Sequence, residues 1–133
     1  ELKRKLGLTY LFISHDISVI GYLADRVAVM YLGEIVETGP VAEVLDNPRH
    51  PYTQSLLSAV PEVGPRRDRA RVRLQGDLPS PLNPPKGCKF HTRCPLAIPL
   101  CQTRAPENRV VGPGHVAACY RLDEHLSLLE GAR

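Results

Sequence analysis

The chain has 133 residues, of which 43% are hydrophobic and 23% are charged, and its formal net charge is +3. This size allows one small domain, or part of a larger domain with an appendix. No stretch approaches the run of about eighteen apolar residues that a membrane-spanning helix needs. Any link to a membrane therefore has to come through a partner.

The charge is divided unequally along the chain. Residues 1–60 hold five Lys and Arg against seven Asp and Glu, a net charge of −2, whereas residues 61–133 hold twelve against seven, a net charge of +5. Five arginines lie between Arg66 and Arg73. Such a run can contact phosphates, but no aromatic side chains alternate with it as base-stacking platforms would. We expect a solvated connector here and no nucleic-acid partner.

The first residues read as the end of a helix. Residues 2–6 are helix-forming, and Gly7 is a typical left-handed stop. The only methionine is Met30, so we expect Glu1 to be a truncation point.

An α/β repeat is predicted next. Thr9–Ser14 is a short, nearly continuous apolar run, which is typical of a strand buried on both faces of a parallel sheet. A helix is predicted over residues 17–24, with Asp16 or Ser18 as its cap. The first forty residues therefore predict the last repeat of a larger sheet.

Turn signals divide the following residues. Residues 26–32 and 34–38 flank Gly33, which predicts a β-hairpin. Two short helices are predicted, one over Val41–Asp46 and one over Thr53–Ala59 with Thr53 as its cap.

Composition changes near residue 61. The arginine-rich connector begins there, and residues 78–85 contain four prolines, which exclude helix and sheet interior. We expect a domain boundary at this point, between residues 1–60 and a loop-rich, cysteine-containing appendix over residues 61–133.

His15 lies at the carboxyl end of the predicted strand, where ligands bind in open α/β sheets. A neutral imidazole can donate an N–H to a phosphate oxygen and so report whether a terminal phosphate is present. Alone, such a histidine is more often a structural residue.

The neighbouring residues favour the functional interpretation. Together, Leu11–Asp16, Leu23–Val27 and Met30–Gly39 resemble the end of an ABC transporter nucleotide-binding domain. The resemblance implies that His15 is the switch histidine that contacts the γ-phosphate of ATP, and that Asp16 lies at the contact between two ATPase subunits. It also implies an α/β fold for this fragment.

Other motifs of that family do not occur in the chain. There is no G-x-x-x-x-G-K-[ST] loop, no L-S-G-G-Q-type signature and no apolar strand ending in Asp-Glu, and we expect these upstream of Glu1. Phosphoryl transfer depends on such groups for positioning and charge neutralisation. The resemblance implies a parent subunit that binds ATP and Mg²⁺ and hydrolyses ATP, and we expect this chain alone to do neither.

Two further stretches narrow the family. Residues 47–61 and 76–95 resemble the ATP-binding subunits of oligopeptide, dipeptide and nickel importers. This implies peptide import driven with a second ATPase subunit and membrane permease subunits, at the cytoplasmic face of the bacterial inner membrane. No acid or nucleophile adjoins His50, so a packing and turn role before Pro51 is expected for it.

The four cysteines follow the spacing C-x(5)-C-x(6)-C-x(17)-C; they are Cys88, Cys94, Cys101 and Cys119. Two disulfides, a zinc ion or an iron–sulfur cluster could cross-link and stabilise such a loop-rich segment. A reducing cytoplasm argues against disulfides, and the lack of a C-x(2–4)-C pair argues against zinc. The resemblance implies a [4Fe-4S] cluster on these cysteines, with zinc as the alternative.

Two histidines are possible substitute ligands, His91 and His115, although loop roles are the more common alternative for both. An appendix that binds a cluster or zinc and senses redox or metal status is the second functional hypothesis. Because a terminal slice of a sheet exposes strand edges, we also expect the fragment to self-associate.

Overall fold

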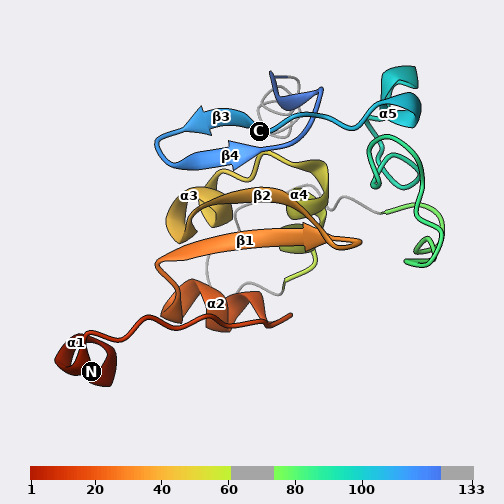
Figure 1. The fold of residues 1–133 in the computed structure, drawn as a ribbon. Helices are drawn as coiled ribbons and strands as arrows, with labels where there is room; N and C mark the ends of the chain where they lie inside the picture. The colour runs from red at the N-terminus through yellow and green to blue at the C-terminus, as the bar shows by residue number, and fades with distance from the viewer. Residues whose placement is uncertain (61–73, 124–133) are drawn as a thin grey trace.

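The computed structural model describes residues 1–60 and 74–123. The predicted arginine connector lies outside them. The helices are α1 (Leu2–Leu6), α2 (Ile17–Leu23), α3 (Val41–Asp46), α4 (Pro51–Ser58) and α5 (Pro99–Thr103). The strands are β1 (Arg26–Tyr31), β2 (Glu34–Pro40), β3 (Arg109–Gly112) and β4 (His115–Ala117) (Figure 1).

The strands form one antiparallel sheet in the order β1-β2-β4-β3. The predicted hairpin is confirmed, because β1 pairs with β2 across a two-residue turn. Leu32 and Gly33 both have positive φ, as the two central residues of a type I′ hairpin turn require. The tail adds its own hairpin to this sheet, because Glu37 and Thr38 of β2 pair with Ala117 and Val116 of β4. Strands on both sides of the expected boundary therefore share a sheet.

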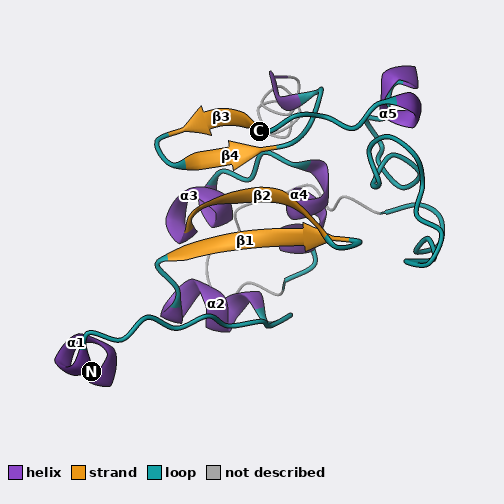
Figure 2. Ribbon diagram, in the orientation of Figure 1, coloured by secondary structure: helices purple, strands orange, loops and turns teal. Residues whose placement is uncertain are grey.

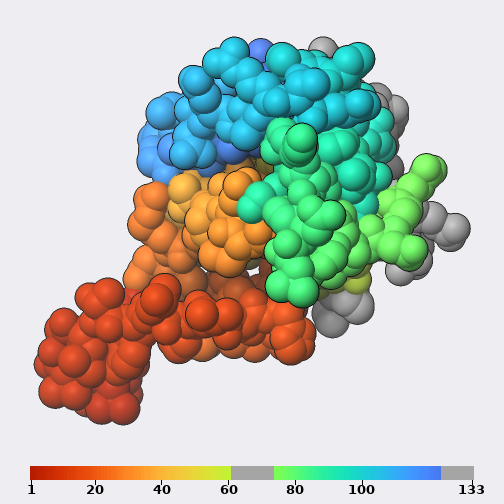
Figure 3. Space-filling model, turned by 45° about the vertical axis from the view of Figure 1, so that its right-hand side comes forward, coloured from red at the N-terminus to blue at the C-terminus, as the bar shows by residue number. Residues whose placement is uncertain are grey.

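The expectation of a buried strand over residues 9–14 is wrong for the described residues. They form no helix or strand there, and Leu11 and Ile13 are 93% and 98% exposed. A buried parallel strand needs neighbouring strands on both sides, and no described strand pairs with this segment. Figure 3 shows the first residues, in red, as a lobe that projects from the body.

Local capping signals explain three of the helix ends. Gly7 ends α1 in the left-handed conformation, and Asp16 caps α2 by accepting hydrogen bonds from Ser18 N and Val19 N. The predicted cap of α4 is wrong: the helix begins at Pro51, and His50 is its cap through Nδ1, which accepts from Tyr52 N at 3.1 Å. Proline favours the first helical position, which moves the start back from Thr53.

The core draws on both halves of the sequence. Its buried apolar side chains are Tyr31, Val44, Leu57, Phe90, Cys101, Ala117 and Leu122. No residue before Tyr31 is buried. Residues 74–98 form turns and loops only, as the proline content predicts (Figure 2). The fold is a small mixed α/β unit whose core lies between the β1–β2 hairpin, α3, α4 and the tail.

Candidate functional site

The Ser-His-Asp run lies on the surface at the start of α2. Ser14 Oγ accepts a hydrogen bond from Asp16 N at 3.0 Å, and Asp16 Oδ1 accepts from Ser18 N and Val19 N at 3.0 and 3.2 Å. These bonds fix the turn on either side of His15, whose side chain is exposed. The structure thus gives Asp16 a capping role and leaves the His15 imidazole accessible.

The four cysteines come from separate segments of the tail. Cys88 and Cys94 lie in loops, Cys101 lies in α5 and Cys119 follows β4, and all four are free thiols. The loop before Cys88 lies against α5: Cys88 N donates to Cys101 O at 2.8 Å, and a Cβ on Gly87 would come within 2.3 Å of that oxygen. Position 87 therefore requires glycine for two reasons: a Cβ would clash with Cys101 O, and the backbone φ is +71°.

A backbone N–H group bonds to one of the sulfurs, since Arg121 N donates to Cys119 Sγ at 3.3 Å. His91 N, by contrast, donates to the carbonyl oxygen of Cys88 at 3.0 Å. Near Cys88 and Cys94, backbone N–H groups lower the pKa of the thiol, although burial outweighs them. Such bonds stabilise a thiolate and hence favour metal ligation.

Burial acts in the opposite direction. It raises the pKa of Cys94 to about 11 and that of Cys119 to about 12, and it raises the pKa of Cys88 as well. The other cysteines add to the shift, since Cys94, Cys88 and Cys101 all raise the pKa of Cys119. The thiols therefore lie near enough to influence one another. At neutral pH, Cys94 and Cys119 stay protonated unless a cation compensates their charge.

Neither predicted substitute ligand takes part in a metal set. His115 Nε2 lies 2.6 Å from Glu37 Oε1 in the core, and His91 Nδ1 lies 2.7 Å from Cys88 O. Across residues 1–60 and 74–123, no three His, Cys, Asp or Glu side chains are grouped so that they could hold a single metal ion.

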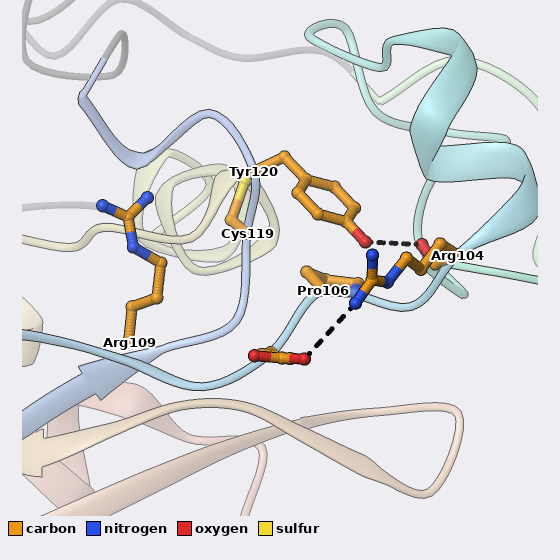
Figure 4. A pocket seen from close by; sticks show the side chains of 6 residues that line it. Arg104, Pro106, Arg109, Cys119 and Tyr120 are labelled. Atoms are coloured by element: carbon orange, nitrogen blue, oxygen red, sulfur yellow. Dashed lines mark hydrogen bonds and ion pairs between the residues drawn. The ribbon is translucent and has the colours of Figure 1, made fainter.

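A pocket of ≈ 230 Å³ opens beside Cys119 (Figure 4). Its lining comes from the segment after α5, from β3 and from the residues after β4. The Tyr120 hydroxyl donates to Arg104 O and Ala105 O at 3.2 and 3.0 Å, and Arg104 Nη2 lies 3.6 Å from Glu107 Oε1. The pocket thus gives solvent a route to the neighbourhood of one cysteine.

Sequence reasoning missed a buried carboxylate that joins the hairpin to the tail. Glu37 is 1% exposed and accepts three hydrogen bonds, from Arg49 N at 2.8 Å, from His50 N at 2.9 Å and from His115 Nε2. The expected packing and turn role of His50 is confirmed, because His50 is 1% exposed and caps α4. This contact between the hairpin and the tail could have been predicted from a glutamate at a strand position that faces the core, because a buried carboxylate needs hydrogen-bond donors.

Comparison with known proteins agrees with this arrangement. Residues 36–101 match the family model described as the oligopeptide/dipeptide transporter, C-terminal region. This stretch begins within β2 and ends at Cys101, and it includes α3, α4 and three of the cysteines. The chain thus contains the C-terminal region of the oligopeptide/dipeptide transporter family.

Curated relatives specify which component of such transporters is similar. The oligopeptide transport ATP-binding protein AppF of Bacillus subtilis (strain 168) is 54% identical over 122 residues, which are 90% of this chain and 37% of that protein. The dipeptide transport ATP-binding protein DppF of Escherichia coli (strain K12) is 49% identical over 124 residues, 93% of this chain and 37% of that protein. DppF of Haemophilus influenzae is 47% identical over 123 residues, 92% of this chain and 38% of that protein.

These matches show that the chain corresponds to the C-terminal region of oligopeptide and dipeptide transport ATP-binding proteins. It spans a little over a third of the length of the relatives it matches. Their names refer to ATP and to peptide transport, and to no metal. None of the described helices is long and apolar enough to cross a membrane.

Proposed function

We propose that this chain works as part of the ATP-hydrolysing subunit of a bacterial importer of oligopeptides or dipeptides. The observation that carries the proposal is the identity of about one half to ATP-binding proteins of peptide transport, which extends over nine-tenths of the chain. The subunit would lie at the cytoplasmic face of the inner membrane, attached through permease subunits, and would pair with a second ATPase subunit. Residues 1–60 would be the end of its nucleotide-binding domain.

His15 is the residue of this chain that would take part in the ATP cycle. Its exposed imidazole, held between two hydrogen-bonded turns, can donate one N–H to a terminal phosphate oxygen. The sequence contains no G-x-x-x-x-G-K-[ST] loop to cradle phosphates, so the remaining contacts would come from other parts of the subunit. Mg²⁺ would supply charge neutralisation there.

A transport assay tests this function. We expect His15→Ala in the subunit to lower uptake of a labelled peptide about a hundredfold, the scale on which loss of one transition-state hydrogen-bond donor acts. Gln102→Ala, another exposed polar residue, is the matched control and should leave uptake unchanged. Full uptake by the His15→Ala subunit would contradict the proposed role.

We further propose that the four cysteines hold a [4Fe-4S] cluster, with zinc as the alternative, and that the tail senses redox or metal status. Four free thiols, of which Cys88, Cys94 and Cys119 have a pKa raised in part by neighbouring cysteines, and a backbone donor to Cys119 Sγ support a polythiolate site. The described residues group no three His, Cys, Asp or Glu side chains as a metal set, so the proposal rests on the number and spacing of the cysteines. Such a cluster supplies one-electron redox chemistry when bound.

Anaerobic purification tests the metal. We expect a brown sample that absorbs near about 400 nm, as thiolate-bound iron–sulfur clusters do, and that contains iron and sulfide in equal amounts. Cys88→Ser should lose this absorbance. A colourless sample with stoichiometric zinc would show that the cysteines bind zinc and not a cluster. A sample without bound metal would refute both alternatives.

The exposed segment before α2 supports a third property. Apolar side chains such as Leu11 and Ile13 are almost fully exposed beside unpaired backbone, and such edges pair with other strands. We propose that the isolated chain self-associates through this segment. Sedimentation should show dimers or larger species that Ile13→Lys dissociates, whereas a monomer at all concentrations would contradict the proposal.

A further inference from the structure

Ser14, the residue before His15, uses its side chain to close a turn around that histidine. Its Oγ accepts a hydrogen bond from Asp16 N at 3.0 Å. A serine hydroxyl that accepts from the backbone two residues further on forms a small turn. Threonine can form the same turn, whereas valine cannot, because it has no hydroxyl. The residue that this turn encloses is His15.

Asp16 closes a second turn directly after the first. Its Oδ1 accepts from Ser18 N at 3.0 Å and from Val19 N at 3.2 Å, which caps α2. Asp16 therefore joins the two turns, because its N–H donates in the first turn and its carboxylate accepts in the second. The chain enters α2 at Ile17 through this double turn, and three hydrogen bonds hold the backbone on either side of His15.

The His15 side chain takes no part in either turn. The imidazole is exposed and makes no hydrogen bond or ion pair to another residue that the structure describes. Its direction is therefore set by the backbone that carries it and by a few side-chain rotamers. A mobile backbone would move the whole ring, so the two turns decide how narrowly the imidazole is directed.

We propose that Ser14 is a positioning residue, which acts through His15 by fixing the backbone from which the imidazole reaches the terminal phosphate of ATP. This proposal rests on the proposed role of His15 in the ATP cycle. The Ser14 hydroxyl contacts no reacting atom and serves only to hold the first turn. A donor that is already in place loses less conformational freedom when it bonds to the transition state, and this raises the rate.

Backbone dynamics test the turn in the chain of 133 residues itself. NMR order parameters of about 0.85 are typical of rigid backbone, and values below about 0.6 are typical of flexible backbone. We expect Ser14→Val to lower the order parameters of the His15 and Asp16 amides toward the flexible range. Ser14→Thr has the same shape as Ser14→Val but keeps the hydroxyl, and it should leave these values unchanged. Equal order parameters in the two variants would overturn the proposal.

Kinetics test whether the turn matters for ATP hydrolysis. In the ATPase subunit assembled with its permease partners, Ser14→Val should lower kcat about tenfold and leave the KM for ATP unchanged, as loss of a transition-state contact does. Ser14→Thr should restore the wild-type kcat. Ser18→Ala is the matched control, because Ser18 is also exposed and joins the second turn only through its backbone. It should leave both constants unchanged.

A double variant shows whether Ser14 acts through His15. In a subunit that carries His15→Ala, the addition of Ser14→Val should change kcat by less than about twofold, because a positioning residue has no effect once the residue it positions is gone. A further tenfold loss, on the order of the single-variant effect, would overturn the proposal, since Ser14 would then act independently of the imidazole.

The outcomes separate this proposal from the function on which it rests. If His15→Ala lowers kcat and Ser14→Val does not, the turn is unnecessary and only the positioning role is refuted. If His15→Ala leaves kcat unchanged, the proposed role of His15 is refuted, and the positioning role of Ser14 is refuted with it.

Discussion

The segment before α2 and the loop around Cys88 have opposite environments, although the first is the more apolar. Four of the six residues 9–14 are apolar or aromatic, yet all six are exposed, whereas the polar, glycine- and proline-containing loop buries Phe90 to 1% exposure. The difference lies in available partners: the loop meets the hairpin and α4, and the described chain places no strand beside residues 9–14. Apolar content creates the need for burial, and only tertiary neighbours satisfy it.

The two phenylalanines give the largest expected contrast. Phe90→Ala should lower the free energy of unfolding by about 4 kcal/mol, because it removes a buried ring and leaves a cavity among three aromatic rings. Phe12→Ala removes an exposed ring and should change the free energy by less than about 0.5 kcal/mol. Urea unfolding monitored by circular dichroism measures both. Equal losses of stability in the two variants would contradict the burial of Phe90 and the exposure of Phe12.

Two glycines with positive φ extend the contrast to the backbone. Gly87→Ala should cost about 3 kcal/mol, because the new Cβ meets Cys101 O in addition to the unfavourable φ of +71°. Gly7→Ala, with a φ of +61° and no atom within 4 Å of the new Cβ, should cost about 1 kcal/mol. Thermal unfolding of the two variants measures the difference. A cost at Gly87 no larger than that at Gly7 would show that the loop before Cys88 is not tightly packed.

Two glutamates of β2 test the joint between the halves. Glu37→Gln should destabilise the chain by about 2 kcal/mol, because an amide cannot accept all three hydrogen bonds that the buried carboxylate accepts. Glu34→Gln loses a partly exposed ion pair with Lys89 and should cost less than about 1 kcal/mol. Chemical denaturation compares them, and exchange of β4 amides should increase only in Glu37→Gln. Unchanged β4 protection there would contradict the role of Glu37 in holding the tail.

Alkaline pH should weaken the metal-free tail. Burial raises the pKa of Cys94 and Cys119 from 9.0 to about 11 and about 12, so an unfolded chain loses these protons before the folded chain does. Their contribution to stability is therefore complete below pH 9 and is lost as pH rises toward 12. The double variant Cys94→Ser, Cys119→Ser should show a smaller fall in stability over this range. An identical fall would mean that the two thiols are not buried as described.

Local signals in the sequence predict the elements whose causes are local. The turn at Gly33, the Asp16 cap and the stop at Gly7 each depend on neighbours within four residues, and each is confirmed. The predicted start of α4 was wrong because two local signals competed: a threonine that can cap a helix, and a proline that favours the first helical position. The His50 cap outweighed Thr53, which instead lies buried in the helix.

Nonlocal pairing explains what the sequence could not predict. The strands β3 and β4 have four and three residues, too few for an alternating pattern, and β4 is held by Glu37 from 78 positions away. The cysteine spacing suggested a set of four thiols, but the donor to Cys119 Sγ and the contacts of Phe90 follow from the folded chain. His115 resembled a metal ligand because a sequence shows the side chain and not its partner.

The smallest expected effect on stability belongs to the residue proposed to matter most for transport. His15 is exposed and precedes the capped turn without being its cap, so His15→Ala should change the free energy of unfolding by less than about 0.5 kcal/mol. Asp16→Ala, one position later, removes the cap of α2 and should cost about 1 kcal/mol. Helical circular dichroism and urea unfolding of the two variants test this pair. A large loss in His15→Ala would mean that the imidazole supports the fold. The proposed contact with phosphate would then be contradicted, because it requires an imidazole that is exposed and not engaged in packing.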